Sequence, residues 1–176
     1  MTAEQRIKTG VRGLENIGFR LLSFETHSDP EANARAIATL LGKAEKSIFI
    51  LTDHLNYSYQ NGAVQNSIAK ALERGVKIHV ACGPKPETES IDILKALVQQ
   101  SKTDGKITLY TLKQSPALHF EVVDRKHVRI EKPHPPGETG TCSVIRLNQE
   151  GLARELENVF TECIFKAVAH KVLGEQ

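Results

Sequence analysis

The chain has 176 residues, of which 40% are hydrophobic and 25% are charged, and its formal net charge is +2. This length predicts one domain with a normal hydrophobic core, and the composition is that of a soluble globular protein. The small net charge gives no argument of its own for nucleic acid binding. No run of residues approaches the ~18 apolar positions that a transmembrane helix requires.

The N-terminus and the cysteines indicate a cytoplasmic protein. The first ten residues, MTAEQRIKTG, are polar and lack the apolar core of a signal peptide. The cysteines Cys82, Cys142 and Cys163 are odd in number and far apart. This arrangement favours reduced thiols and lacks the paired spacing of a zinc site. No cofactor is expected.

The first part of the chain predicts an N-terminal arm or first strand over residues 1–28, followed by the main domain over residues 29–176. The sequence SDPE supplies residues that can cap a helix and an acidic residue for its first turn, and apolar residues at helical spacing follow it. These signals predict a helix over Pro30–Ala44. The wholly apolar SIFILT run, Ser47–Thr52, predicts a strand buried on both faces.

A polar, turn-rich segment, Asp53–Gly62, follows this strand. Open α/β sheets place their ligand sites beyond the carboxyl ends of the strands, so Asp53, His54, Asn56 and Tyr57 are candidates for a site. A solvated loop explains the same composition, because loops are polar by default. Both interpretations stay open.

The rest of the chain continues the alternation of helices and strands and then changes it. Gly75 is predicted to end a helix in the C′ position, and Asn148 is predicted to cap the last helix. The predicted elements are a helix Val64–Arg74, a strand Val76–Cys82, a helix Glu87–Ser101, a strand Lys106–Leu112, a β-hairpin, a strand Cys142–Leu147 and a helix Gln149–Val172. This order predicts an α/β fold with a mostly parallel sheet, a late β-hairpin and helices on both faces.

The β-hairpin carries most of the candidate chemistry. An apolar run Leu118–Val123 leads to a turn at Asp124-Arg125-Lys126, and His127, Arg129 and Glu131 then alternate onto one strand face. Together with nearby cations, this face is suited to hold an anion such as a phosphate ester. The alternative is the ordinary solvent face of a half-exposed strand. The candidate ligand-binding residues are His119, His127, Arg129, Glu131, His134 and His54.

A metal-binding site is a less well supported hypothesis for the same region. His119, His127, Glu131 and His134 are competent ligands. Their spacings match no zinc signature, so no metal site is expected.

Four stretches of the sequence carry a family resemblance. They are ARAIATLLGKAEKSIFILT, IAKALERGVKIHVACG, LHFEVVD with Gly140-Thr141 sixteen residues after its Asp, and LARELENVFTECIFKAV. In this order they resemble the opening helix and strand, the third strand, the motif strand with its Gly-Ser, and the last helix of one half of a phospholipase D-like domain. The resemblance spans nearly the whole chain and implies the α/β sandwich of that superfamily.

The family's catalytic signature is His-x-Lys followed by four residues and Asp, in which the His attacks phosphorus and a second His protonates the leaving oxygen. When the sequence is aligned on Asp124, Ala117 takes the His position and His119 takes the Lys position. When it is aligned on His119 instead, Glu121 and Lys126 replace the Lys and the Asp. The first alignment keeps the apolar pair before Asp124, and in it the nucleophile is absent.

The resemblance therefore implies a catalytically degenerate domain, a binding or regulatory module for a phosphate-containing ligand, a nucleic acid or a protein partner. The alternative is an active phosphodiesterase or nuclease in which His119 is the nucleophile and Asp124 orients it. A third interpretation is an interaction module in a defence or transcription assembly. Because the family works with two halves about a two-fold axis, we expect a homodimer with an isologous interface through the hairpin region.

Overall fold

The computed structural model describes residues 25–27, 29–55, 57–84, 92–96, 107–116, 118–131, 141–165 and 167–173. Residues 92–96 are helical, within the predicted helix Glu87–Ser101. The remaining elements are β1 Glu25–His27, α2 Pro30–Leu41, β2 Ser47–Thr52, α3 Tyr57–Gln60, α4 Gly62–Glu73, β3 Lys77–Cys82, β4 Ile107–Leu112, β5 His119–Val123, β6 His127–Glu131, β7 Thr141–Arg146, α6 Glu150–Ile164 and β8 Ala167–Leu173.

The strands form one sheet in the order β1-β7-β6-β5-β2-β3-β4-β8. Its centre is parallel, because β3 pairs in parallel with both β2 and β4. The β5–β6 hairpin is present as predicted, and the pairings on both flanks of the centre are antiparallel. Leu51 faces Phe120 and Ile48 faces Val123 across β2 and β5. The start of β5 therefore lies beside the carboxyl end of β2, at the edge where ligand sites are expected.

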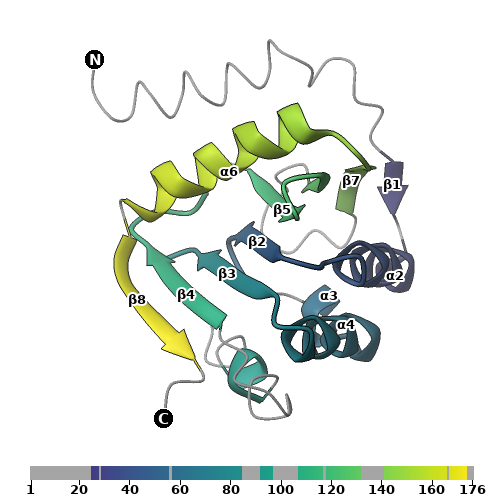
Figure 1. Ribbon diagram of the computed structural model, residues 1–176, viewed down its shortest axis with the longest axis horizontal. Helices are drawn as coiled ribbons and strands as arrows, with labels where there is room; N and C mark the ends of the chain where they lie inside the picture. The colour runs from purple at the N-terminus through teal and green to yellow at the C-terminus, as the bar shows by residue number, and fades with distance from the viewer. Residues whose placement is uncertain are drawn as a thin grey trace.

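Helices cover both faces of the sheet, as the sequence predicts (Figure 1). Helices α2, α3 and α4 lie on one face and α6 lies on the other. In β2, Ile48 and Ile50 join the core beneath α2 and α4, whereas Leu51 joins the core beneath α6. This alternation inside an unbroken apolar run confirms that β2 is buried on both faces.

Side-chain caps fix the starts of the two helices near the hairpin. Asp29 Oδ1 accepts a hydrogen bond from the Glu31 amide at 2.9 Å, and Asn61 Oδ1 accepts one from the Ala63 amide at 2.9 Å. The Asn61 cap starts α4 at Gly62, two residues before the predicted start. Gly75 has a φ of +77°, which confirms the predicted C′ position.

The C-terminal prediction is wrong in two respects. Helix α6 ends at Ile164, and the following β8 pairs with β4 in antiparallel fashion, so the predicted helix to Val172 becomes a helix and a strand. Pairing with β8 satisfies the backbone groups that β4 would otherwise expose at the sheet edge. Asn148 is not the cap: it has a φ of +57°, and Gln149 takes the N-cap position without a side-chain hydrogen bond.

Part of the region predicted as an arm or first strand lies in the sheet, because β1 pairs with β7. The boundary at residue 28 stays a prediction. The predicted loop after β2 contains a short helix, α3, which packs against α2. This helix places Tyr59 over the hairpin and Ser58 against Asn33 of α2, and both side chains are buried.

Candidate functional site

The hairpin turn is built around two residues with left-handed backbone conformation. Asp124 and Arg125 have φ values of +55° and +57°, and the Lys126 amide donates to the Val123 carbonyl at 3.0 Å. Positive φ at both central residues is the requirement of a type I′ turn, whose twist matches that of the flanking strands. Along the hairpin, His119 faces Glu131 at the open end, and Val123 faces His127 at the turn end.

Asp124 ties this turn to the loop that enters β2. Its Oδ2 accepts from the Glu45 amide at 2.8 Å, and its Oδ1 accepts from the amides of Lys46 and Ser47 at 2.8 and 2.9 Å. At about 3.3 Å per residue, Asp124 lies roughly 16 Å along the chain from His119. The structure does not bring these two side chains together, so Asp124 is not placed to orient His119.

The predicted polar face of β6 is buried rather than exposed to solvent. Arg129 is 1% exposed and Glu131 is 6% exposed. Arg129 Nη1 donates to both carboxylate oxygens of Glu121 at 3.1 and 3.0 Å, and its Nη2 donates to Glu131 and to Asn33 Oδ1. Tyr59 Oη donates to Glu121 Oε1 at 2.6 Å. Arg129 and Glu131 therefore belong neither to a solvent-exposed strand face nor to an exposed anion-binding rim, and both of these predictions are wrong for them. Helices α2 and α3 cover the two side chains.

We call this set, Asn33, Tyr59, Glu121, Arg129 and Glu131, the buried polar layer. Burial by itself would lower the pKa of Arg129, but the charges of Glu121 and Glu131 outweigh burial and raise it. Burial, reinforced by the Glu121 charge, raises the pKa of Tyr59, so its phenol stays neutral. With both carboxylates ionised, the layer holds two negative charges against one guanidinium.

The structure divides the predicted ligand-binding residues between the two ends of the hairpin. His119 is partly buried at the start of β5, opposite Glu131. His127 lies at the turn end, where its Nδ1 accepts from the Asn148 amide at 3.2 Å. His54 has a half-exposed side chain, with Nε2 3.7 Å from Asp53 Oδ2. His134 and Ala117 lie outside the described residues, and the ligand-binding roles stay predictions.

The residues weighed as metal ligands do not gather at one place: Glu131 pairs with His119, but His127 lies away from both, and His134 lies outside the described residues. His119 and His127 are at opposite ends of the hairpin, about 13 Å apart at four residues per strand. In the described part of the chain, no three His, Cys, Asp or Glu side chains are arranged to hold a metal ion.

The carboxyl ends of β2 and β3 meet at the edge that contains His119. Asp53 follows β2 and packs against Gly83 after β3, where an added Cβ would lie 2.3 Å from Asp53 Oδ1. Only glycine fits this close approach. Burial, with a contribution from Asp53, raises the pKa of Cys82 to about 12, so the thiol is protonated and unreactive near neutral pH. The side chain of Asp53 is 25% exposed, so the loop after β2 is partly packed and partly solvated.

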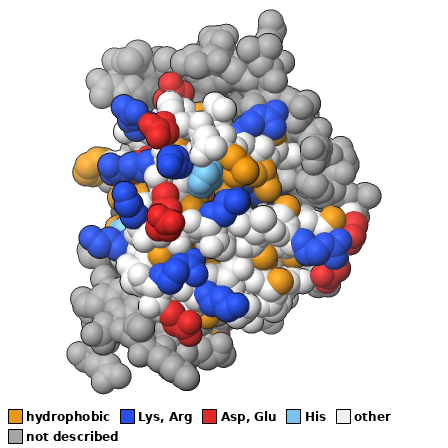
Figure 2. All heavy atoms as spheres, turned by 45° about the vertical axis from the view of Figure 1, so that its right-hand side comes forward, with side chains coloured by type: hydrophobic (Ala, Val, Ile, Leu, Met, Phe, Trp, Pro, Cys, Tyr) orange, Lys and Arg blue, Asp and Glu red, His pale blue; other side chains and the backbone are white. Residues whose placement is uncertain are grey.

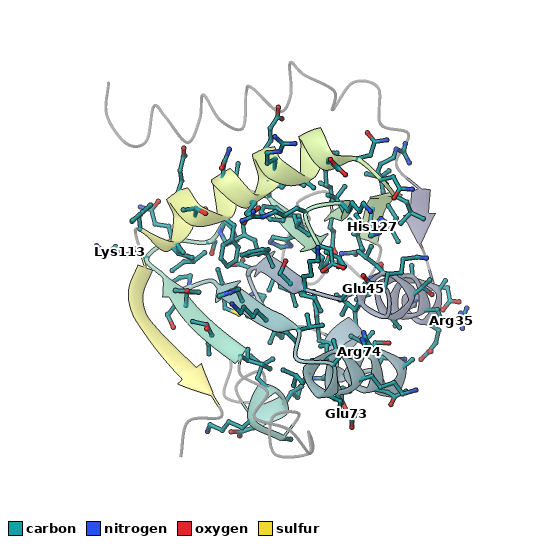
Figure 3. All side chains as sticks on the ribbon, in the orientation of Figure 1. Arg35, Glu45, Glu73, Arg74, Lys113 and His127 are labelled. Carbon is teal, nitrogen blue, oxygen red and sulfur yellow. The ribbon has the colours of Figure 1, made fainter. Side chains whose placement is uncertain are left out.

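The opposite edge of the sheet, at the hairpin turn, carries a group of exposed charged side chains. A cavity of about 550 Å³ is lined by Glu45, Lys46, Asp124, Arg125, Lys126, Glu150 and Arg154. Arg74 lies beside it, because its guanidinium donates to the Ala44 carbonyl. Glu45, Arg74 and His127 all lie on this part of the molecule (Figure 3). Figure 2 shows Lys and Arg side chains gathered there with acidic side chains between them.

Sequence reasoning missed the buried polar layer. The available signal was Glu121, a charged residue inside the apolar run of β5, because an ionised side chain in a buried strand requires a partner. The sequence also indicates Arg129, the partner of Glu121, as a candidate site residue, but the prediction that its side chain lies on an exposed strand face is wrong.

The fold recurs among solved structures. The Nuc protein from Salmonella typhimurium, a phospholipase D family member, superimposes with a TM-score of 0.58 and 17% sequence identity, over 82% of this chain and 95% of that one. The chain has the phospholipase D-like fold. TrmBL2, an archaeal chromatin protein described with a novel mode of DNA binding, matches with a TM-score of 0.59 and 17% identity, over 94% of this chain and 62% of that one.

The phospholipase D-like fold is shared by proteins of several functions. Phosphatidylserine synthase from Haemophilus influenzae matches with a TM-score of 0.56 and 18% identity, over 82% of this chain and 37% of that one. No protein-family model matches the sequence, and no curated protein matches it by sequence. Within the described ranges, no helix is long and apolar enough to cross a membrane. At these identities the similarity establishes the fold alone.

Proposed function

We propose that this chain is a catalytically degenerate phospholipase D-like module that binds a phosphate-bearing ligand without cleaving it. The observation that carries the proposal is Ala117 at the position of the family's nucleophile, in the register set by Asp124. Asp124 supports this register because it directly follows the motif strand β5 and ties the hairpin to β2. The methyl group of alanine has no lone pair with which to attack phosphorus.

In this proposal His119 takes the place of the family's lysine as the group that meets phosphate. An imidazolium donates hydrogen bonds and carries a positive charge. It lies at the carboxyl edge of the sheet, where Asp53 and His54 also lie. The scaffold and a phosphate-binding group are retained, while the bond-breaking group is lost.

The direct test is hydrolysis of bis(p-nitrophenyl) phosphate, a generic phosphodiester, by the full chain. We expect no release of nitrophenolate above the buffer rate, in the wild type or in His119→Ala. Hydrolysis by the wild type that is lost in His119→Ala but kept in His127→Ala would overturn the proposal. His127 is the matched control because it lies on the same hairpin at its other end.

The alternative is an active phosphodiesterase that uses His119 as nucleophile. The observation that favours it is that the buried Glu131 is the cross-strand partner of His119. In this alternative the Glu131 carboxylate, rather than that of Asp124, would orient the imidazole. Acid quench during turnover would then trap phosphohistidine on His119. The absence of a labelled adduct in a reaction that demonstrably turns over would exclude this mechanism.

Among phosphate-bearing ligands we favour nucleic acid. The DNA binding described for TrmBL2 supports this choice, as do the exposed cations Lys46, Lys126 and Arg154 around the cavity at the turn edge. Charge reversal with Lys126→Glu and Arg154→Glu is expected to weaken binding to double-stranded DNA and to reduce its salt dependence. Equal affinity of the variant and the wild type at two salt concentrations would count against this surface.

The homodimer also remains a proposal. The hairpin lies inside the sheet, between β7 and β2, so its strands have no free edge for a partner. An isologous interface in this region would use the end of the hairpin that carries His119. Light scattering that gives the mass of one chain at tens of micromolar would contradict the dimer.

A further inference from the structure

We infer that a groove between α2 and β7 is a docking site for a partner protein that presents an acidic amphipathic helix. The inference goes beyond the proposed function, because it concerns another surface and another class of ligand. It stands whether or not the chain binds phosphate.

The groove runs along α2 and has a volume of about 250 Å³. The lining residues from this helix and its C-terminal end share one helical face: Arg35, Ala36, Thr39, Leu40 and Lys43. The other wall consists of Ile145 in β7 and Leu147, which follows that strand. A helix from a partner would therefore lie alongside α2.

The centre of the groove is apolar. Leu40 belongs to the core beneath α2, Ile145 packs against that core, and Leu147 is 45% exposed. The hydroxyl of Thr39 donates to the Arg35 carbonyl at 2.8 Å, so it is already satisfied within the helix. A single exposed apolar side chain is ordinary on a protein surface. Here it lies beside a groove with room for another apolar side chain, and docking would remove both from water.

Cations flank this apolar centre. Arg35 and Lys43 are the charged residues of the lining, and both are positive. The Arg35 guanidinium lies 3.5 Å from Asp29 Oδ2, but both side chains are more than half exposed, and such pairs contribute little. Lys43 has no ion pair within the described ranges. The charge of the groove therefore favours an acidic partner.

The spacing of the two cations matches a helix. Arg35 and Lys43 are eight residues apart, which corresponds to about 12 Å along a helix axis. On a docked helix, residues at i and i+7 lie on one face about 10 Å apart, with i+3 and i+4 between them. Acidic residues at i and i+7 would meet the two cations, while a leucine between them entered the groove beside Leu147. This is the helix-in-groove mode of recognition.

Nucleic acid is the competing occupant, because it is also an anion. Figure 2 shows hydrophobic side chains at the surface beside Lys and Arg side chains. A nucleic acid backbone would contact the cations, but it has no apolar side chain with which to fill the groove. The exposed Leu147 therefore favours a protein.

The test is a titration of the full chain into a labelled probe, followed by fluorescence anisotropy. The probe is an alanine-based helical peptide with two glutamates seven positions apart and leucines at the third and fourth positions after the first glutamate. One control peptide has alanine in place of both leucines, and a second has lysine in place of both glutamates. We expect the wild type to bind the probe and to bind each control peptide at least tenfold more weakly.

Variants of the chain assign the binding to the groove. Leu147→Asp is expected to lose at least tenfold in affinity for the probe. The double variant Arg35→Glu with Lys43→Glu is expected to lose the probe and to bind the lysine peptide instead. Phe165→Ala is the matched control, because Phe165 is 84% exposed at the far end of α6, and it is expected to bind as the wild type does. The leucine-to-alanine peptide keeps the test decisive if Leu147→Asp fails to fold.

Three outcomes would overturn the inference. The first is no change in anisotropy with the wild type at about 1 mM chain. The second is binding of the probe that is the same in Leu147→Asp or with the leucine-free peptide, because charge alone would then explain it. The third is a loss of double-stranded DNA binding in folded Leu147→Asp as large as in Lys126→Glu with Arg154→Glu, which would assign the groove to nucleic acid.

Discussion

The two faces of the β5–β6 hairpin are both buried at their centres and are chemically opposite. The face toward α6 is apolar and consists of Phe120, Val122, Val128 and Ile130. The face toward α2 and α3 carries the buried polar layer. The apolar face derives its stability from the area that it removes from water, so its losses scale with the volume deleted. The polar face depends on mutual neutralisation, so removal of one partner is expected to cost much more than its size suggests.

The largest expected effect comes from breaking the polar face at its centre. Arg129→Ala leaves Glu121 and Glu131 buried without their cation, and we expect a loss of about 3–5 kcal/mol in the free energy of unfolding. Urea denaturation followed by circular dichroism measures it. The control converts the layer to apolar residues, with Arg129→Met, Glu121→Leu and Glu131→Leu together, and is expected to be close to neutral. A loss below about 1 kcal/mol in Arg129→Ala would show that the layer is not a coupled unit.

Removal of one neutral member of the layer is expected to have an intermediate effect. Tyr59→Phe deletes the 2.6 Å hydrogen bond to Glu121, and hydrogen bonds to charged groups contribute about 1.5–3 kcal/mol. A double-mutant cycle with Glu121→Gln isolates the interaction. If the two substitutions are simply additive, the phenol does not stabilise the Glu121 charge.

On the apolar face a conservative truncation is expected to cost less. Ile130→Val removes one methylene from a fully buried side chain, and such changes typically cost about 0.5–1.5 kcal/mol. Leu147→Ala is the matched control, because Leu147 is 45% exposed and a surface change usually stays within about 0.5 kcal/mol. If Ile130→Val costs more than Arg129→Ala, the contrast between the two faces is wrong.

The smallest expected effect concerns pH on the α6 side of the sheet. Burial, with a contribution from Lys77, lowers the pKa of His79, whose ring stacks on Phe49 at 5.1 Å. The unfolded chain then binds the proton more tightly than the folded chain, so stability falls as the pH drops below about 6.5. Unfolding measured at pH 7.5 and 5.5 should show a smaller difference in His79→Phe than in the wild type. Identical differences in the two proteins would exclude this contribution.

The sequence was sufficient to predict most of the fold. The β2 run and the hairpin are found where local apolar runs and turn residues place them. The C-terminal strand was missed because Ala167 and Val172 also satisfy helical spacing, and only the open edge of β4 decides between helix and strand. Tertiary context overrode the local pattern there.

The candidate site was less predictable than the fold. Alternation on β6 correctly placed Arg129 and Glu131 on one face, but a one-dimensional pattern does not reveal whether that face meets water or another layer. Helices α2 and α3 cover that face, and their contacts with the hairpin join residues 96 positions apart (Asn33 and Arg129) and 62 positions apart (Tyr59 and Glu121). Asp124 likewise lies in the turn after β5, as the sequence predicts, yet its three amide partners lie in a loop whose position only the assembled sheet determines.

The Asp124 contacts also bear on how the chain folds. The amides that open β2 find their acceptor 77–79 residues later, on the turn of the hairpin. We therefore expect that the first half of the chain does not complete its central strand during synthesis until the hairpin has emerged and docked. We expect a fragment that ends before residue 124 to remain sensitive to limited proteolysis around residues 43–47, whereas the full chain is protected there. The three hydrogen bonds to Asp124 make the entry to β2 depend on the hairpin turn, so we expect the first half of the chain not to fold as a separate unit.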